Sequence, residues 1–233
     1  ALQSVPEKAL RLRFDEITLQ GRWHAQTLDL PTIRVRSRGG VLQGRAQYAA
    51  AQQAVQADMQ LRLPGSSAWV KGRLSPTNGQ GQVGVDARNL LQTGGWLQQW
   101  PLLQNTLRAR RLEGHAQLRA DWRGGWQNNG QNMQLNALLT APSVTLRSTT
   151  RADTPLLVQN ARLSAQGRLS DMRVDAQGQL RQGGYALHTV LQGQGGKRDT
   201  GWKAHVQALQ ASLQDTAQNR RWQAKLAAPV SVE

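Results

Sequence analysis

The chain has 233 residues and a formal net charge of +15 at pH 7, with 29 lysines and arginines against 14 aspartates and glutamates. Charged residues make up only 18% of it, which argues against a disordered polyelectrolyte, and the lack of cysteine excludes disulfides and thiolate metal sites. The positive charge favours anionic partners, which include nucleic acid, lipopolysaccharide, phospholipid headgroups and acidic proteins.

No run of apolar residues approaches the ~20 that cross a bilayer, and no signal-peptide pattern opens the chain. The sequence starts abruptly inside a patterned stretch. We therefore expect a piece of a longer protein whose membrane anchor and targeting signal lie outside it.

The region before residue 64 shows a period of two. Leu10, Leu12 and Phe14 alternate with arginines, the phase slips at residues 15–16, and the alternation then resumes. The later apolar positions of this region are Ile17, Leu19, Gly21, Trp23, Ile33, Val35, Val55, Ala57, Met59, Leu61 and Leu63. Strict alternation places the apolar side chains of a strand on one face and the polar ones on the other.

Residues 89–107 break this rhythm. Trp96, Trp100 and the leucines around them fall nearer to helical spacing, while Gly94–Gly95 and Pro101 prevent one long helix. We expect two short helical turns here. They form either a plug over one end of the sheet or an element that presents Trp96 and Trp100 to a membrane or a partner.

Alternation returns in the second half of the chain and continues almost to its end. The apolar positions are Ala116, Leu118, Ala120, Trp122, Met133, Leu135, Ala137, Leu139, Leu163, Ala165, Gly167, Met172, Val174, Ala176, Gly178, Leu180, Tyr185, Leu187, Thr189, Leu191, Trp202, Ala204, Val206 and Ala208. The runs end in turn-forming sequences at residues 38–40, 128–130, 182–184 and 195–196.

These patterns predict an all-β chain: a long, curved, mostly antiparallel sheet with a short helical insertion around residues 89–107. We expect residues 1–233 to form one elongated segment, interrupted by that helical or loop insertion at residues 88–108.

The predicted apolar face is rich in alanine and glycine, which leave space. A strongly curved sheet folded on itself would keep a U-shaped apolar groove between its walls, and a dozen or more strands at ~4.8 Å spacing would make it on the order of 60 Å long. The alternative is a filled core, in which the same rows interdigitate. A groove suits acyl chains, because burying one CH₂ is worth about 0.8 kcal/mol. The residues expected to contact lipid are Leu118, Leu135, Leu139, Leu163, Val174, Leu180, Leu187, Leu191 and Val206.

Several segments carry a family resemblance. They are residues 85–91 (Val-Asp-Ala-Arg-Asn-Leu-Leu), the patch from Trp96 to Leu103, residues 112–126 (Leu-Glu-Gly-His-Ala-Gln-Leu-Arg-Ala-Asp-Trp-Arg-Gly-Gly-Trp), and the opening stretches 19–23, 28–31 and 39–44. The likeness covers most of the chain: these segments resemble the repeat signature of the TamB family and its sequence pattern of strands and turns. Related AsmA-like proteins share this style.

The resemblance implies a β-taco groove that carries phospholipid between the inner and outer membranes of a Gram-negative envelope. It also implies a periplasmic location, as part of an inner-membrane-anchored protein, and a TamA-like outer-membrane barrel of the Omp85 type as partner. The family has no catalytic residues to carry over. The alternative function is a structural or chaperone role in barrel assembly, through pairing of sheet edges with incoming strands.

The sequence contains no constellation typical of an enzyme. Its four histidines are far apart, and its acidic residues are scattered. Residues 79–84 fit Gly-x-Gly-x-x-Gly, but Val83 and Val85 continue into a strand, whereas a dinucleotide loop requires a helix. We therefore predict no catalytic residues, no cofactor and no metal site.

The arginines have three interpretations: a solvated polar face, attraction to anionic headgroups or lipopolysaccharide, and nucleic-acid binding. They spread over many predicted strands instead of gathering in one patch, as Arg34, Arg119 and Arg181 illustrate. Because Trp122 and Trp202 share the apolar rows, we expect them to pack and not to stack on bases, so nucleic acid is not an expected partner.

Overall fold

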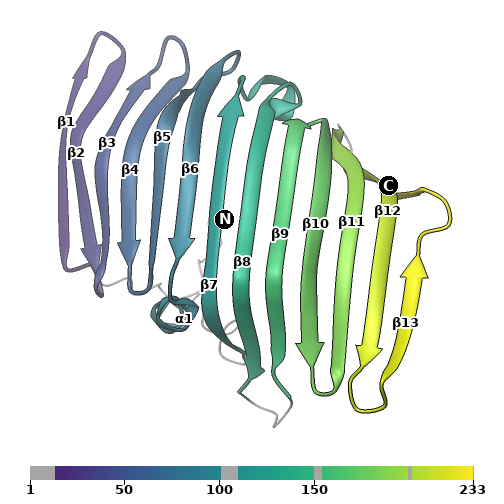
Figure 1. Ribbon diagram of the computed structural model, residues 1–233. Helices are drawn as coiled ribbons and strands as arrows, with labels where there is room; N and C mark the ends of the chain where they lie inside the picture. The colour runs from purple at the N-terminus through teal and green to yellow at the C-terminus, as the bar shows by residue number, and fades with distance from the viewer. Residues whose placement is uncertain (1–13, 101–109, 150–153, 199–200, 233) are drawn as a thin grey trace, which may run out of the picture.

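In the part of the chain that the structure describes, fourteen strands form one antiparallel sheet, in which β1 to β13 pair in sequence order and β14 pairs with β12 (Figure 1). The computed structural model describes residues 14–100, 110–149, 154–198 and 201–232. The strands are β1 (Glu16–His24), β2 (Thr27–Ser37), β3 (Gly40–Ala49), β4 (Ala54–Leu63), β5 (Ser66–Leu74), β6 (Gly79–Ala87), β7 (Arg110–Arg123), β8 (Gln134–Ser148), β9 (Leu156–Arg168), β10 (Asp171–Gln182), β11 (Tyr185–Arg198), β12 (Gly201–Asp215), β13 (Arg220–Lys225) and β14 (Val230–Val232). Helix α1 (Leu90–Leu97) lies between β6 and β7, and the short 3-10 turn η1 (Gln127–Gly130) between β7 and β8.

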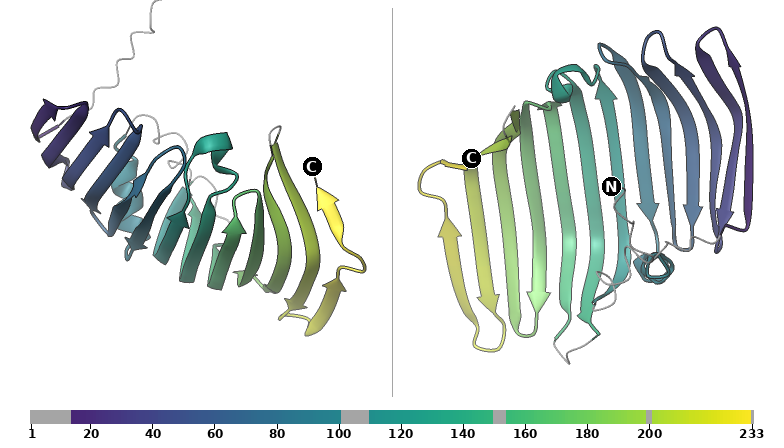
Figure 2. Two further views of the ribbon diagram at one scale, coloured as in Figure 1. Left: turned by 90° about the horizontal axis from the view of Figure 1, so that it is seen from above. Right: turned by 180° about the vertical axis from the view of Figure 1, so that it is seen from behind.

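The sheet is a single layer that curves and twists along its length (Figure 2). Contacts between elements join neighbouring strands of the meander, and α1 lies against β7. The chain exposes 16255 Å² to solvent, whereas a compact protein of its mass exposes about 10,000 Å². In the described part of the chain the buried apolar residues are Ala54, Ala87, Trp96 and Met172. Most strand side chains therefore keep some contact with water.

The prediction of an all-β, curved, antiparallel sheet with a short helical insertion is confirmed. The sheet is open, and among the described residues no second sheet covers either face. The filled core, in which apolar rows of two walls interdigitate, is therefore wrong for this part of the chain. The first alternating run, Leu10 and Leu12, falls outside the described residues.

The expected turn at residues 195–196 is wrong. Gly195 pairs with Met172 on one side and with Ala204 on the other, so both glycines lie inside β11. A Cβ atom on Gly196 would collide with the backbone of Ser170. The glycine there accommodates a close backbone approach within the strand and does not mark its end.

The short helical insertion begins where the sequence predicted it, but Gly94 and Gly95 do not interrupt it. Helix α1 runs through Gly94 and Gly95 as one helix of eight residues, and the Asn89 side chain caps it by accepting from the backbone N–H of Gln92 at 3.1 Å. This cap and the packing of Trp96 offset the roughly 1 kcal/mol that each glycine costs a helix. The second expected turn falls on residues 101–109, which lie outside the described part of the chain.

Candidate functional site

One face of the sheet, the apolar face, carries apolar side chains in rows that run across the strands. Because antiparallel partners lie side by side, the pairing register decides which residues share a row. The first row crosses β1 to β12 without a polar residue: Ile17, Val35, Leu42, Leu61, Ala68, Val85, Leu118, Leu139, Leu163, Ala176, Leu191 and Leu209. Twelve successive strands thus form one continuous aliphatic stripe.

The nine residues predicted to contact lipid all lie on the apolar face. They belong to four parallel rows: Leu118, Leu139, Leu163 and Leu191 to the first, Val174 and Val206 to the second, Leu135 to the third, and Leu180 and Leu187 to the fourth. Alternation in the sequence predicts the shared face, and the structure adds the register that makes them neighbours.

The side chains of the second row extend less far from the sheet than those of the first, because several of them are small. At its centre Ala120 pairs with Ala137, and Ala137 pairs with Ala165. On either side of these alanines the row continues through Val83 and Val174. A strip of small side chains therefore runs beside the leucines of the first row.

Large side chains of the apolar face remain accessible. Leu139 and Leu163, near the middle of the sheet, are 39% and 40% exposed, and Ile17 and Leu19 on the edge strand β1 are 61% and 62% exposed. Each exposed Å² of apolar surface costs about 25 cal/mol relative to burial. An exposed apolar area of this kind marks an interaction surface.

In the third row, the positions on β5 and β6 are the glycines Gly72 and Gly81, and the Trp122 ring covers both. Its indole lies over Gly81, its direct partner on β6, and reaches Gly72 on β5, so a Cβ atom at either glycine would meet the ring. The glycines of residues 79–84 therefore serve packing within a strand, as the sequence predicted when it placed this motif on a strand and not on a cofactor loop.

Helix α1 packs at one end of the apolar face, where Trp96 meets the start of β3. Trp96 is only 9% exposed, its Nε1–H donates to the backbone oxygen of Arg38 at 2.9 Å, and its ring lies against Gly40. The Trp100 ring stands beside it, with 5.2 Å between the ring centroids. Trp96 therefore faces the sheet, which contradicts the prediction that it faces a membrane or a partner and agrees with a plug. Trp100 is partly buried in the same cluster.

The opposite face, the polar face, carries glutamine, arginine and aspartate in equivalent rows. Several arginines pair with a carboxylate across or along a strand, for example Arg45 with Asp58 at 3.4 Å and Arg173 with Asp175 at 3.1 Å. These pairs are exposed, so each contributes well under about 1 kcal/mol. The excess of arginine leaves this face positively charged.

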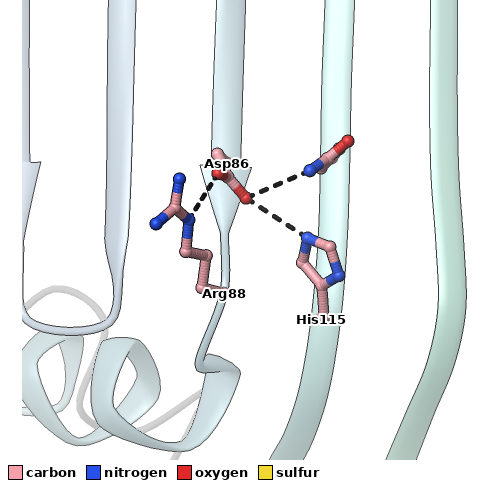
Figure 3. A network of polar contacts seen from close by, with 4 residues as sticks. Asp86, Arg88 and His115 are labelled. Carbon is pink, nitrogen blue, oxygen red and sulfur yellow. Dashed lines mark hydrogen bonds and ion pairs between the residues drawn. The ribbon is translucent and has the colours of Figure 1, made fainter.

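The most connected polar cluster surrounds Asp86 at the end of β6 (Figure 3). Its carboxylate accepts from Arg88 Nε at 2.8 Å and from Gln117 Nε2 at 3.4 Å, and lies 3.2 Å from His115 Nε2. The hydrogen bond from Arg88 lowers the pKa of Asp86 below its ordinary value of 3.8, partial burial opposes this shift, and His115 adds to it. The cluster ties β6 to β7 beside the start of α1.

Two other kinds of site are missing from the described residues. No group of three or more histidine, aspartate or glutamate side chains there is placed to hold a metal ion. In the same part of the chain, no helix has the length and hydrophobicity to cross a membrane.

Comparison with known proteins gives no match: no family model fits the chain, and no curated protein or solved structure is significantly similar to it. The resemblance to the TamB family therefore stays a prediction.

Proposed function

We propose that the apolar face binds the acyl chains of phospholipids and carries them along the sheet, in a periplasmic part of an inner-membrane-anchored protein that serves the outer membrane. The observation that supports this most is the unbroken first row, which puts no polar side chain in the path of a tail from β1 to β12. A tail on this surface exchanges water for aliphatic carbon, and each buried CH₂ contributes about 0.8 kcal/mol.

The dimensions of the face match this role. Twelve strands at about 4.8 Å spacing give a stripe about 50 Å long. Along β10 the face extends from Met172 in the third row to Leu180 in the fourth, with Gly178 in a further row between the first and the fourth. These eight residue steps span about 27 Å, whereas one leaflet of a bilayer has an acyl depth of about 15 Å. An acyl tail therefore fits along the strands or across them. The small side chains of Ala120, Ala137 and Ala165 let it approach the backbone of the sheet most closely.

Headgroups stay in water at the margins of the face. The four rows offer them no charged side chain, so the binding energy comes from the tails and selects weakly among headgroups. In the full-length protein we propose a TamA-like outer-membrane barrel as partner.

A second candidate function is a structural or chaperone role in the assembly of outer-membrane barrels. It is favoured by the edge at β1, beside which no further strand lies among the described residues, and where Ile17 and Leu19 are 61% and 62% exposed. An unpaired edge can accept an incoming strand through its backbone. This function depends on the edge and is indifferent to a charge in the middle of the apolar face.

The test uses two adjacent leucines of β8 that point to opposite faces. Leu139 belongs to the first apolar row, whereas Leu138 pairs with Arg119 on the polar face. Phospholipid in an organic extract of the purified chain is measured by mass spectrometry, beside a soluble control protein. Leu139→Asp should lower the co-purifying phospholipid about tenfold, because a carboxylate under a tail must lose its water. Leu138→Asp should leave it unchanged.

Far-UV circular dichroism of both variants shows whether the sheet persists. A wild-type extract without phospholipid, or equal loss in two folded variants, contradicts the proposal. In a cell that lacks the native protein, barrel assembly that survives Leu139→Asp while phospholipid is lost from the extract would favour the chaperone role.

A further inference from the structure

The polar face contains one open cleft whose chemistry differs from its surroundings. It has a volume of about 540 Å³ and lies over β5 to β9, on the side of the sheet opposite to the proposed lipid surface. Its lining includes Trp69, Arg119, Arg162, Gln82, Asn136 and Gln166. It combines a large aromatic ring with two cations and several amides, and nothing in the proposed lipid function uses it.

Trp69 differs from the polar side chains that surround it on this face. It is 40% exposed on a face made of glutamine, arginine and aspartate. The ring lies over Gly84 of β6, because a Cβ atom there would meet the indole atoms Nε1, Cε2 and Cζ2. Because Gly84 has no side chain, the Trp69 ring can lie flat on the sheet, and the outer surface of the ring faces the cleft.

Two arginines line this cleft and have no recorded carboxylate partner in the described residues. Arg119 lies opposite Gly84 on β7, next to the ring, and Arg162 extends from β9. This contrasts with Arg45 and Arg173, which are paired with aspartates. The cleft therefore has unneutralised positive charge and can accept a compact anion by bidentate hydrogen bonds.

The remaining polar groups of the cleft are amides, the Asp121 carboxylate and the Ser164 hydroxyl. Asn136 Nδ2 donates to Asp121 Oδ2 at 2.9 Å, which fixes both side chains across β7 and β8. Gln82 and Gln166 offer both donors and acceptors within the same lining. Such groups suit a ligand that carries several hydroxyls, each a donor and an acceptor at once.

We propose that this cleft binds an anionic saccharide, a sugar ring that carries a phosphate or a carboxylate. The C–H surface of the sugar lies on the Trp69 ring, its hydroxyls bond to the amide of Gln82, and its anionic group meets Arg119. Arg162 and Gln166, on β9, line the far side of the cleft and add to its positive charge and polarity. Single-stranded nucleic acid fits less well, because it uses a series of aromatic rings along a basic groove. Trp69 is the one aromatic side chain that lines this cleft.

The ligands for the test are glucose 6-phosphate, glucuronic acid, glucose, inorganic phosphate and adenosine monophosphate, titrated into the 233-residue chain by calorimetry. We expect glucose 6-phosphate or glucuronic acid to bind with a Kd on the order of 1 mM, a value ordinary for a ligand of this size. Whichever of the two binds identifies the anion as phosphate or carboxylate. Glucose and inorganic phosphate should each bind at least about tenfold more weakly, because glucose lacks the anionic group and phosphate lacks the sugar ring.

The variants separate the ring from the charge. Trp69→Ala and Arg119→Gln should each weaken binding of the charged sugar about tenfold. Arg181→Gln, which removes an exposed arginine of the polar face on β10 outside the cleft, should not change it. Trp69→Phe keeps a flat ring and should retain most of the affinity even if Trp69→Ala disturbs the sheet.

Three results would overturn the proposal: no binding of either charged sugar at 20-fold the expected Kd, inorganic phosphate binding as tightly as the charged sugar, or adenosine monophosphate binding more tightly. Unchanged affinity in Trp69→Ala would do the same. None of these outcomes affects the acyl-chain proposal, because the cleft and the apolar rows lie on opposite faces.

Discussion

The two faces of the sheet are built by the same strands, yet they present different chemistry to water. Leu138 and Leu139 make this plain: they are adjacent in β8, and one pairs with Arg119 while the other pairs with Leu118. The residue type does not decide what its surroundings are. The cross-strand neighbours decide the surroundings of each leucine. Leu139 belongs to an aliphatic stripe, whereas Leu138 is an isolated apolar side chain among polar and charged ones.

Both faces also use tryptophan over glycine, with different results. Trp122 covers Gly81 and Gly72 on the apolar face, and its Nε1 atom is buried; Trp69 covers Gly84 on the polar face and keeps an open outer surface. The same packing device therefore closes a gap on one face and builds a platform on the other. Three pairs of variants test how far the two faces differ.

The largest difference is expected between two tryptophans on opposite faces. Trp96 is buried at the end of the apolar face and donates to the Arg38 backbone oxygen, so Trp96→Ala should lower the free energy of unfolding by about 3 kcal/mol. Trp69→Ala should lower it by about 1 kcal/mol, because its ring is already partly hydrated. Urea denaturation followed by circular dichroism measures both.

Amide hydrogen exchange shows where the loss is located. In Trp96→Ala, the amides of α1 should exchange faster than those of β9 and β10, which lie away from the helix. Equal losses of stability in the two variants would show that the polar face buries its tryptophan as deeply as the apolar face.

A smaller difference is expected between the glycines beneath the rings. A Cβ atom on Gly81 meets the Trp122 indole and the backbone oxygen of Lys71, which cannot move aside, so Gly81→Ala should cost about 2 kcal/mol. A Cβ atom on Gly84 meets only atoms of the exposed Trp69 ring among its three nearest neighbours, so Gly84→Ala should cost about 1 kcal/mol as the ring shifts. Thermal unfolding of both variants tests this order.

Gly95→Ala serves as the control for that experiment. Gly95 lies inside α1 and a Cβ atom there meets no atom within 4 Å, so alanine should stabilise the helix by about 0.5–1 kcal/mol. A cost at Gly84 equal to that at Gly81 would mean that the Trp69 ring is held as rigidly as the Trp122 ring, contrary to its exposure.

Alternation predicted most of the strands and the shared face of the nine lipid-contacting candidates, and its interruption predicted the position of the helical insertion. It named no run at β3, β5 or β13. It could not predict the register, because a period of two fixes the face of a residue and not its partner on the next strand. The hairpin between β1 and β2 was equally hidden: Ala25 and Gln26 both adopt positive φ there, at 44° and 61°, although neither is a residue type that favours this region.

The cleft of the polar face was hidden for a related reason. Trp69 follows Ala68 in β5, and nothing in the local sequence places its ring beside Arg119, some 50 residues later. That neighbourhood arises from two pairings, β5 with β6 and β6 with β7, and from Gly84 lying between them. Long-range arrangements of this kind become visible only when the strand order and the register are known together.

The smallest expected effect concerns the Asp86 cluster, where the polar face meets the helix. Because the Arg88 hydrogen bond lowers the pKa of Asp86 below 3.8, the carboxylate stabilises the folded chain above that pH, and this contribution is lost as pH falls through the lowered pKa. Arg88→Gln removes the largest cause and should raise the pKa of Asp86 toward 3.8, as followed by NMR of the carboxyl carbon between pH 2 and 6. His115→Gln should produce a smaller rise, because His115 contributes less than Arg88. A larger rise in His115→Gln than in Arg88→Gln would show that the cross-strand contact, and not the neighbour along the chain, holds this carboxylate in its charged form.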